Sequence, residues 1–176
     1  MKTASFSKAA RLMALLMAFA IAFVSTPAEA AGHPKTFGVN MGYNSYNESA
    51  EAGLFFQYGF SRYFRLSADA QVVFRNKHRD AFIFDLNAHV PVVSKGGFEL
   101  YPFAGVNYSS WSTHFTVEED DREISASSRH GSFGINAGLG FGYKISSTLK
   151  LKLEVGYTGV KERSACRALL GIGFCF

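Results

Sequence analysis

Long apolar runs are almost absent from this chain. Beyond residue 30, no stretch approaches the ~18 apolar residues of a transmembrane helix, so we expect no such helix there. The net charge is only +4, with acidic and basic residues interspersed, which gives no support for a nucleic-acid partner. The GxSxG, HExxH and Walker sequences are missing, so no motif supports an enzyme class. We therefore expect no enzyme activity, no cofactor and no metal.

Cysteine and proline are both scarce, with 2 and 4 residues. Cys166 and Cys175 fall on one predicted strand, which separates them by roughly 30 Å at ~3.3 Å per residue. Because a disulfide requires Cα atoms within about 7 Å, we predict two unpaired thiols, unless the strand begins after Cys166 and its loop folds back. Pro102 falls inside another predicted strand, where the missing N–H group predicts a bulge or a shifted register.

The one apolar run that does exist lies at the start of the chain. Leu12–Val24 is almost entirely apolar, with a basic stretch before it (Lys2–Arg11) and small residues after it (Pro27–Ala30). This order is typical of a secretory signal peptide, which we predict over residues 1–30. An uncleaved anchor is the alternative, but the run is shorter than the ~20 residues that span a bilayer. Residues 31–176 remain as one domain, with a net charge of about +2.

Apolar and polar residues alternate along most of this domain. In LKLKLEVGY, residues 149–157, leucine and valine alternate with lysine and glutamate, and successive side chains of a strand leave on opposite faces. The alternating segments are close to the ~9 to 11 residues of a tilted membrane strand. They predict an all-β fold, an eight-stranded antiparallel up-and-down β-barrel, with strands at Phe37–Tyr43, Ala52–Phe60, Phe64–Phe74, Phe82–Val90, Phe98–Tyr108, Phe133–Tyr143, Leu149–Tyr157 and Ala168–Phe176.

The polar faces of these strands carry charges of both signs. Against lipid, an arginine or lysine at the midplane of a bilayer would cost roughly 2 to 4 kcal/mol, so these faces are expected to point inward. The lumen of an eight-stranded barrel is just wide enough for side chains to fill it. We predict a polar network in the lumen that includes Arg65, Asp69, Gln71, Asp85, His89, Glu99, Asn136, Lys150, Lys152 and Glu154.

Alternation alone also fits a soluble lipocalin-like barrel, whose apolar set faces inward around a ligand. The aromatic residues favour a membrane barrel, because they gather at both ends of the apolar set and aromatic rings prefer the two interfaces of a bilayer. The predicted girdle at one end consists of Phe37, Phe60, Phe64, Phe98, Tyr143 and Phe176, and that at the other end of Tyr43, Phe74, Phe82, Tyr108, Phe133 and Tyr157.

The connections between the predicted strands alternate in length. Short periplasmic turns and longer extracellular loops are typical of outer-membrane barrels. The short connections lie around Ser61–Arg62, Ser94–Gly97 and Ser146–Thr148, and the longer ones are Asn44–Ala50, Asn76–Asp80, Thr113–His130 and Gly159–Ala165. All the long loops are therefore expected at one end of the barrel.

The segments FRLSADAQVVF and GINAGLGFGYKISSTLKLKLEVGY resemble the hairpins of the small outer-membrane barrels of the OmpX/Ail and OmpA-barrel type. The last strand, LLGIGFCF, resembles the terminal aromatic signature that such barrels present to their assembly machinery through a residue in the place of Phe176. The resemblance implies a location in the bacterial outer membrane, contact with its lipid and lipopolysaccharide, and recognition by the barrel-assembly machinery.

Two regions are candidates for function. The lumen network is either an ion pathway, as in a narrow porin or small-molecule conduit, or a packed polar plug, which the width of the barrel favours. The loop Thr113–His130 is the expected surface for an extracellular partner in a structural, adhesive or protective role. Its acidic residues are either a solvated face or a site for a divalent cation or a basic partner, and they are Glu118, Glu119, Asp120, Asp121 and Glu123.

A lipid-modifying enzyme is the remaining alternative. Some eight-stranded barrels are lipid A deacylases, and His130 and Ser132 share one face of a predicted strand. However, the face is the polar one, Phe133 stands where that family has asparagine, and no acid on the strand would orient a catalytic base. The sequence therefore favours a barrel without catalytic activity.

Overall fold

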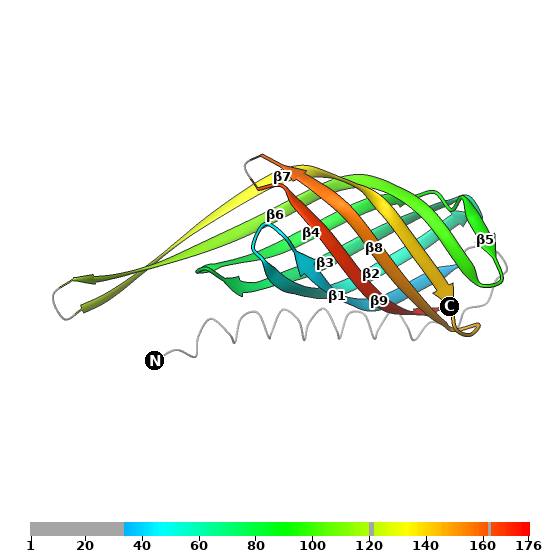
Figure 1. The fold of residues 1–176 in the computed structure, drawn as a ribbon, viewed down its shortest axis with the longest axis horizontal. Coiled ribbons are helices and arrows are strands. Elements are labelled where there is room, and N and C mark those ends of the chain that lie inside the picture. Colours follow the sequence, from blue (N-terminus) through cyan, green and yellow to red (C-terminus); the bar gives the residue numbers. More distant parts are fainter. Residues whose placement is uncertain (1–33, 120–121, 162) are drawn as a thin grey trace. The chain divides into compact units, whose positions relative to one another are not determined.

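The computed structural model describes residues 34–119, 122–161 and 163–176, with the backbone alone over 114–119 and 122–127 (Figure 1). The predicted signal peptide lies outside these residues and stays a prediction. No helix in the described part is long and apolar enough to cross a membrane.

The described chain forms one closed antiparallel sheet (Figure 1). Each strand except β4 pairs with the next along the chain, and the pairs β1–β9 and β4–β6 complete the circle, with β5 as a short addition beside β6. The prediction of an eight-stranded antiparallel barrel is thus confirmed. The strands are β1 (Lys35–Asn44), β2 (Ser49–Ser61), β3 (Phe64–Asn76), β4 (Arg79–His89), β5 (Val93–Lys95), β6 (Phe98–Glu119), β7 (Arg122–Lys144), β8 (Leu149–Val160) and β9 (Ala165–Cys175).

Polar side chains point into the barrel and apolar side chains point out. On β8, Lys150, Lys152 and Glu154 are buried, whereas Leu153 and Val155 are 41% and 50% exposed. The same alternation runs along β3, β4 and β9. An apolar outer surface around a polar interior is the arrangement that suits lipid rather than water. This inward set of polar residues excludes the lipocalin-like alternative, whose apolar residues would line the interior.

The predicted aromatic girdles lie on the outer face. At one end, Phe60 packs 5.8 Å from Phe64, and at the other end Tyr108 packs 5.0 Å from Phe133 (ring centroids). Most members of both girdles are exposed, and Phe37, Phe82 and Phe176 are half-buried. We call the first end, which carries the connections 62–63, 90–97 and 145–148, the turn end, and the other the loop end.

The expected strict alternation of long and short connections is wrong in three places, which are the connections between β3 and β4, between β4 and β6, and between β6 and β7. The connection at the loop end between β3 and β4 is only the turn Lys77–His78, because Asn76 pairs with Arg79 and both residues have joined the strands. Lys77 and His78 take φ angles of 47° and 63°, which a tight turn of this kind requires. At the turn end, the connection between β4 and β6 spans 90–97 and contains β5.

The segment Thr113–His130 is not a loop. It continues β6 and β7 as a two-stranded ribbon whose pairs run from Thr113 with Ser128 to Glu119 with Arg122. Figure 1 shows this ribbon projecting far beyond the other strands at the loop end. The loop was predicted because of the acidic residues. The flanking segments, however, contain residues with high β propensity, such as Val117 and Ile124, which pair with each other across the ribbon.

Pro102 does not distort its own strand. β6 keeps one register with β7 through Pro102, so the expected bulge in this strand is absent there. The irregularity lies in the partner instead, because β4 pairs with β6 up to His89 opposite Phe103, and β5 resumes one residue out of step at Val93 opposite Leu100. The proline is accommodated because β4 ends opposite it. The backbone hydrogen bonds of residues 90–92 use the carbonyl groups of Pro102 and Leu100 and do not require the N–H group that the proline lacks.

Candidate functional site

The predicted polar residues of the lumen all lie inside the barrel and form a layered network. The layer nearest the turn end centres on Glu99 of β6. Its Oε2 atom accepts hydrogen bonds from Arg65 Nη1 at 3.0 Å and from Lys150 Nζ at 2.6 Å. The Arg65 guanidinium also lies 4.7 Å from the centre of the Tyr101 ring, so one carboxylate and one aromatic ring hold two cations.

The middle layer reverses this ratio, with one cation between two carboxylates. Lys152 Nζ donates to Asp69 Oδ1 and to Glu154 Oε2, both at 3.0 Å. Ser67 and Tyr101 donate further hydrogen bonds to these carboxylates, at 2.7 and 2.8 Å. Lys152 is only 2% exposed, so its charge depends entirely on these partners.

His89 lies beside this layer and is fully buried. Its ring stacks on Tyr101, with the ring centroids 4.8 Å apart and the planes at 15°. Nε2 lies 3.9 Å from Glu154 Oε1, which is beyond hydrogen-bond distance, and neither ring nitrogen has a hydrogen-bond partner within the described residues. We conclude that His89 fills space through aromatic packing rather than through hydrogen bonds.

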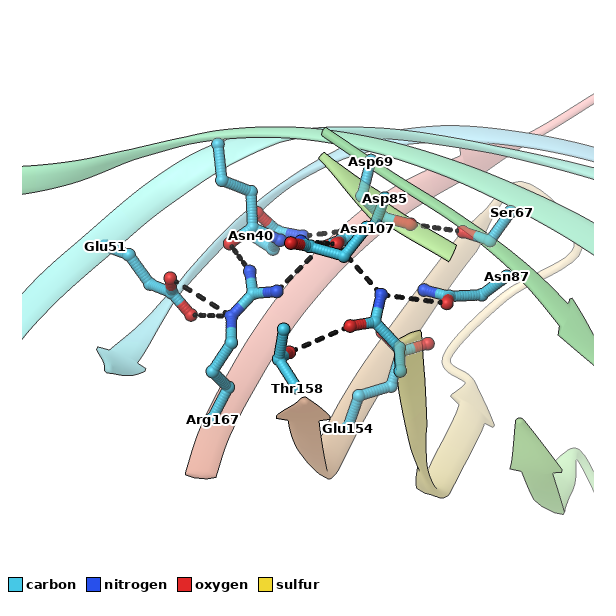
Figure 2. Close-up of polar contacts among 12 residues, drawn as sticks. Asn40, Glu51, Ser67, Asp69, Asp85, Asn87, Asn107, Glu154, Thr158 and Arg167 are labelled. Atoms are coloured by element: carbon cyan, nitrogen blue, oxygen red, sulfur yellow. Dashed lines mark hydrogen bonds and ion pairs between the residues drawn. The ribbon is translucent and has the colours of Figure 1, made fainter. Parts of the chain in front are cut away.

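The layer toward the loop end centres on Arg167 of β9 (Figure 2). Its guanidinium donates to both carboxylate oxygens of Glu51 at 3.0 and 3.2 Å, to Asp85 Oδ2 at 2.7 Å and to Gln71 Oε1 at 2.6 Å. Asp85 Oδ1 in turn accepts hydrogen bonds from Asn107 and Asn136. The Nε, Nη1 and Nη2 groups of this almost fully buried arginine each donate to a different residue, so three partners fix its geometry.

Asp69 and Asp85 are cross-strand neighbours, and each pairs with its own cation. In the described interior, five carboxylates share four strong cations: Glu51, Asp69, Asp85, Glu99 and Glu154 with Arg65, Lys150, Lys152 and Arg167. Loss of Lys152 or Arg167 would therefore leave two acids without a cation. A cavity of about 20 Å³ beside Asp85, Asn87 and Glu154 has room for roughly one water molecule.

Several residues of this network were not in the predicted set, among them Ser67 and Asn107, which donate to Asp69 and Asp85. Glu51 and Arg167 belong to the layer toward the loop end and are also outside the predicted set. Tyr101 and Phe55 are buried aromatic residues that touch Arg65 and Lys152. Gly140 makes room for Tyr101, because a Cβ atom there would clash with the Tyr101 ring. Strict parity along β2 and β6 would have found both aromatics, since Phe55 and Tyr101 occupy inward positions between outward residues.

An apolar cluster inside the loop end was also missed. Val73, Ala81, Ile83 and Trp111 are each less than 5% exposed, and Tyr46 packs against them from the turn between β1 and β2. The Tyr46 and Trp111 rings meet edge to face, with centroids 4.9 Å apart. These apolar residues occupy inward positions of their strands. The sequence analysis treated each inward face as polar along its whole length and therefore did not identify them.

The remaining candidates are not assembled into a site. His130 pairs with Trp111 and Ser132 with Ser109 across β6 and β7, and no carboxylate of the described side chains contacts either residue. Both thiols are unpaired, as predicted. The acidic residues of the ribbon have no described side-chain positions, so their role stays a prediction.

Comparison with known proteins gives a consistent result. A family model described as an outer membrane protein beta-barrel domain matches residues 15–168. No curated protein sequence matches. Among solved structures, the N-terminal barrel domain of Pseudomonas aeruginosa OprF is similar over 82% of this chain and 97% of its own, with a TM-score of 0.62 and 18% identity.

Two further structures show the same fold. Ail, the attachment invasion locus protein of Yersinia pestis, is similar over 84% of this chain and 100% of its own, with a TM-score of 0.57 and 12% identity. Neisserial surface protein A gives a TM-score of 0.55 and 12% identity over 82% of this chain and 96% of its own. At these identities the likeness concerns the fold alone.

Proposed function

Because the chain belongs to the family of outer membrane protein β-barrel domains, we propose that it is a non-conducting, non-enzymatic barrel that holds the β6–β7 ribbon at the cell surface. The observation that carries this proposal is the filled interior. Tyr101, Lys152, His89 and Asp69 are fully buried in and beside the middle layer, and Gln71 is fully buried in the layer toward the loop end. Three cross-linked layers of charge block an ion that would have to pass between them.

Conductance in planar bilayers tests the closed lumen. We expect no stable current steps from the inserted wild-type protein, and none from Lys152→Ala or Glu154→Ala, because the layers above and below Lys152 stay in place. A 16-stranded porin in the same bilayer shows that insertion and recording work, since barrels of that size leave an aqueous channel. Steps that change size in the two variants would establish an ion pathway and overturn the closed lumen.

The ribbon supports a role in surface interaction. β6 and β7 contain 22 and 23 residues, whereas the other long strands contain 10 to 13. The pairing of β4 with β6 ends at Thr113, and that of β8 with β7 ends at Gly134. The β6–β7 pairing beyond these points adds nothing to the closure of the barrel, so its length is better explained by something that it contacts outside. Among the structural relatives, Ail is named for attachment and invasion.

We propose that the partner of the ribbon presents a basic surface, because acidic residues crowd the turn of the ribbon. We expect a variant with Glu118, Glu119 and Glu123 changed to glutamine and Asp120 and Asp121 to asparagine to bind immobilised poly-lysine on the order of tenfold more weakly, mainly through slower association. Binding would be measured at several salt concentrations on the purified barrel in lipid nanodiscs.

The matched control is Glu48→Gln with Asp80→Asn, which removes acids elsewhere at the loop end, one from the connection 45–48 and one from the start of β4. If both variants lose binding equally, the ribbon has no special role. If neither loses binding, the acidic residues of the ribbon are a solvated face.

The lipid-facing surface and the last strand complete the proposal. The girdles and the apolar band would contact outer-membrane lipid and lipopolysaccharide. The last strand, β9, together with Phe176 would be the segment that the assembly machinery recognises. In the folded barrel, Phe176 exchanges backbone hydrogen bonds with Lys35, both at 3.0 Å.

A further inference from the structure

The turn between β1 and β2, residues 45–48, folds over the loop-end mouth of the barrel. Tyr46 carries the contact, because its ring packs edge to face on Trp111 and against Val73, Ala81 and Ile83. The Arg79 guanidinium lies 5.9 Å from the centre of the same ring, and its Nη1 atom donates to the Tyr46 hydroxyl at 3.4 Å. An apolar lid therefore separates the polar interior from the solution outside.

Hydrogen bonds latch this turn to the hairpin of β3 and β4. Asn47 is 2% exposed, and its Nδ2 atom lies 3.1 Å from Phe74 O and 3.2 Å from Arg79 O. Asn76 Nδ2 donates in return to Asn47 O at 2.9 Å and to Glu48 O at 3.0 Å. The turn is a single short segment, held in addition by Ser45, which bonds to Cys166 of β9, and by Glu48, which pairs with Lys77. Its release breaks this small set of contacts and leaves the strand pairing of the sheet in place.

Polar groups without partners lie just beneath the lid. Gln71, Ile83 and Ser109 form one cross-strand row of β3, β4 and β6, directly below the row that contains Trp111. Gln71 Nε2 and Ser109 Oγ, with Asn107 Oδ1 one row deeper, are buried and have no hydrogen-bond partner among the described residues. The oxygen atom of the Gln71 amide, Oε1, accepts a hydrogen bond from Arg167.

Buried groups of this kind are normally satisfied by ordered water. The charged layers of Arg167 and Lys152 close the route from the turn end, and the apolar cluster closes the route from the loop end. Water reaches the row of Gln71 and Ser109 most directly when the turn lifts. We propose that residues 45–48 are a removable cap, held shut by Tyr46 on Trp111, whose opening admits water and small uncharged polar molecules to this row.

Thiol reactivity beneath the cap tests the proposal. Ser109→Cys is close to isosteric and places a thiol at the row itself, in a protein whose own thiols are removed by Cys166→Ser and Cys175→Ser. The probe is methyl methanethiosulfonate, which is small and uncharged. We expect slow modification with the native cap, and modification at least tenfold faster when Tyr46→Ala is added.

Three further variants isolate the cap. Tyr46→Phe keeps the ring and should react as slowly as the parent, whereas Asn76→Ala loosens the latch and should give an intermediate rate. Tyr43→Ala is the matched control, because Tyr43 lies on the same hairpin but is 50% exposed on the outer face, and it should leave the rate unchanged. All variants would be compared after the far-ultraviolet circular dichroism spectrum has shown an intact barrel.

Trp111 supplies a second readout, because it is the only tryptophan of the chain. Tyr46→Ala should shift its emission to longer wavelength and increase its quenching by acrylamide. The proposal is overturned if Tyr46→Ala changes neither the emission nor the thiol rate, or if the parent thiol reacts as fast as a free thiol. The cap and the closed lumen are tested independently, because conductance reports on the charged layers and thiol reactivity reports on the cap.

Discussion

Replacing Arg167 with methionine is expected to lower the free energy of unfolding of the barrel by about 3 to 5 kcal/mol. The change removes hydrogen bonds to Glu51, Asp85 and Gln71 at once, and it leaves two buried carboxylates without a cation. Unfolding by urea in lipid vesicles, followed through Trp111 fluorescence, would measure the loss.

The control for this change is Lys77→Met. Lys77 pairs with Glu48 at 2.7 Å, but both side chains are more than half exposed, so the loss should stay below about 1 kcal/mol. A second comparison adds Glu51→Gln and Asp85→Asn to Arg167→Met. If unpaired charge is the cause, neutralising both acids restores part of the stability, and if it restores none, the arginine acts through packing alone.

Replacing Val155 with arginine is expected to cost about 2 to 4 kcal/mol, because the new charge would face lipid near the middle of the membrane-spanning band. Val155 lies at the middle of β8 and is 50% exposed on the outer face. Its neighbours Lys152 and Glu154 face inward, where charge is already paired. Unfolding by urea in vesicles would again give the difference.

The matched control is Ile145→Arg, which places the same side chain at the turn end. Ile145 is 51% exposed and lies in the connection between β7 and β8, so the cost should fall to about 0 to 1 kcal/mol. Equal costs at both positions would contradict the depth-dependent lipid contact that the apolar outer surface implies.

The eight barrel strands and their inward faces could be read from the sequence because one rule governs both. Parity places Lys150, Lys152 and Glu154 on the face opposite Leu153 and Val155 without any knowledge of neighbouring strands. Once the polar face is known to point inward, the positions of Arg65, Lys150 and Glu99 near the same ends of their strands predict that they meet. In the structure both cations pair with Glu99.

Parity could not supply the contacts that depend on register. Arg167 meets Glu51 across β1, because β9 and β2 both pair with β1, and only the register brings the two side chains to one level. The cap was hidden for another reason, since Tyr46 belongs to a turn and has no parity to follow. The ribbon was hidden because clustered acids outweighed the β propensity of their neighbours.

The pairing of β1 with β9 also dictates an order of assembly. Every other pairing of the eight barrel strands joins neighbours in sequence, so those hairpins need only local chain closure. The seam between β1 and β9 instead joins opposite ends of the domain, so the loop that it closes contains nearly the whole domain. The cap is stitched across the same seam, because Ser45 N donates to Cys166 O and Cys166 N donates to Ser45 Oγ. The interior is therefore sealed only in the last step of folding, and a chain that stalls before it keeps two unpaired edges open to a neighbour.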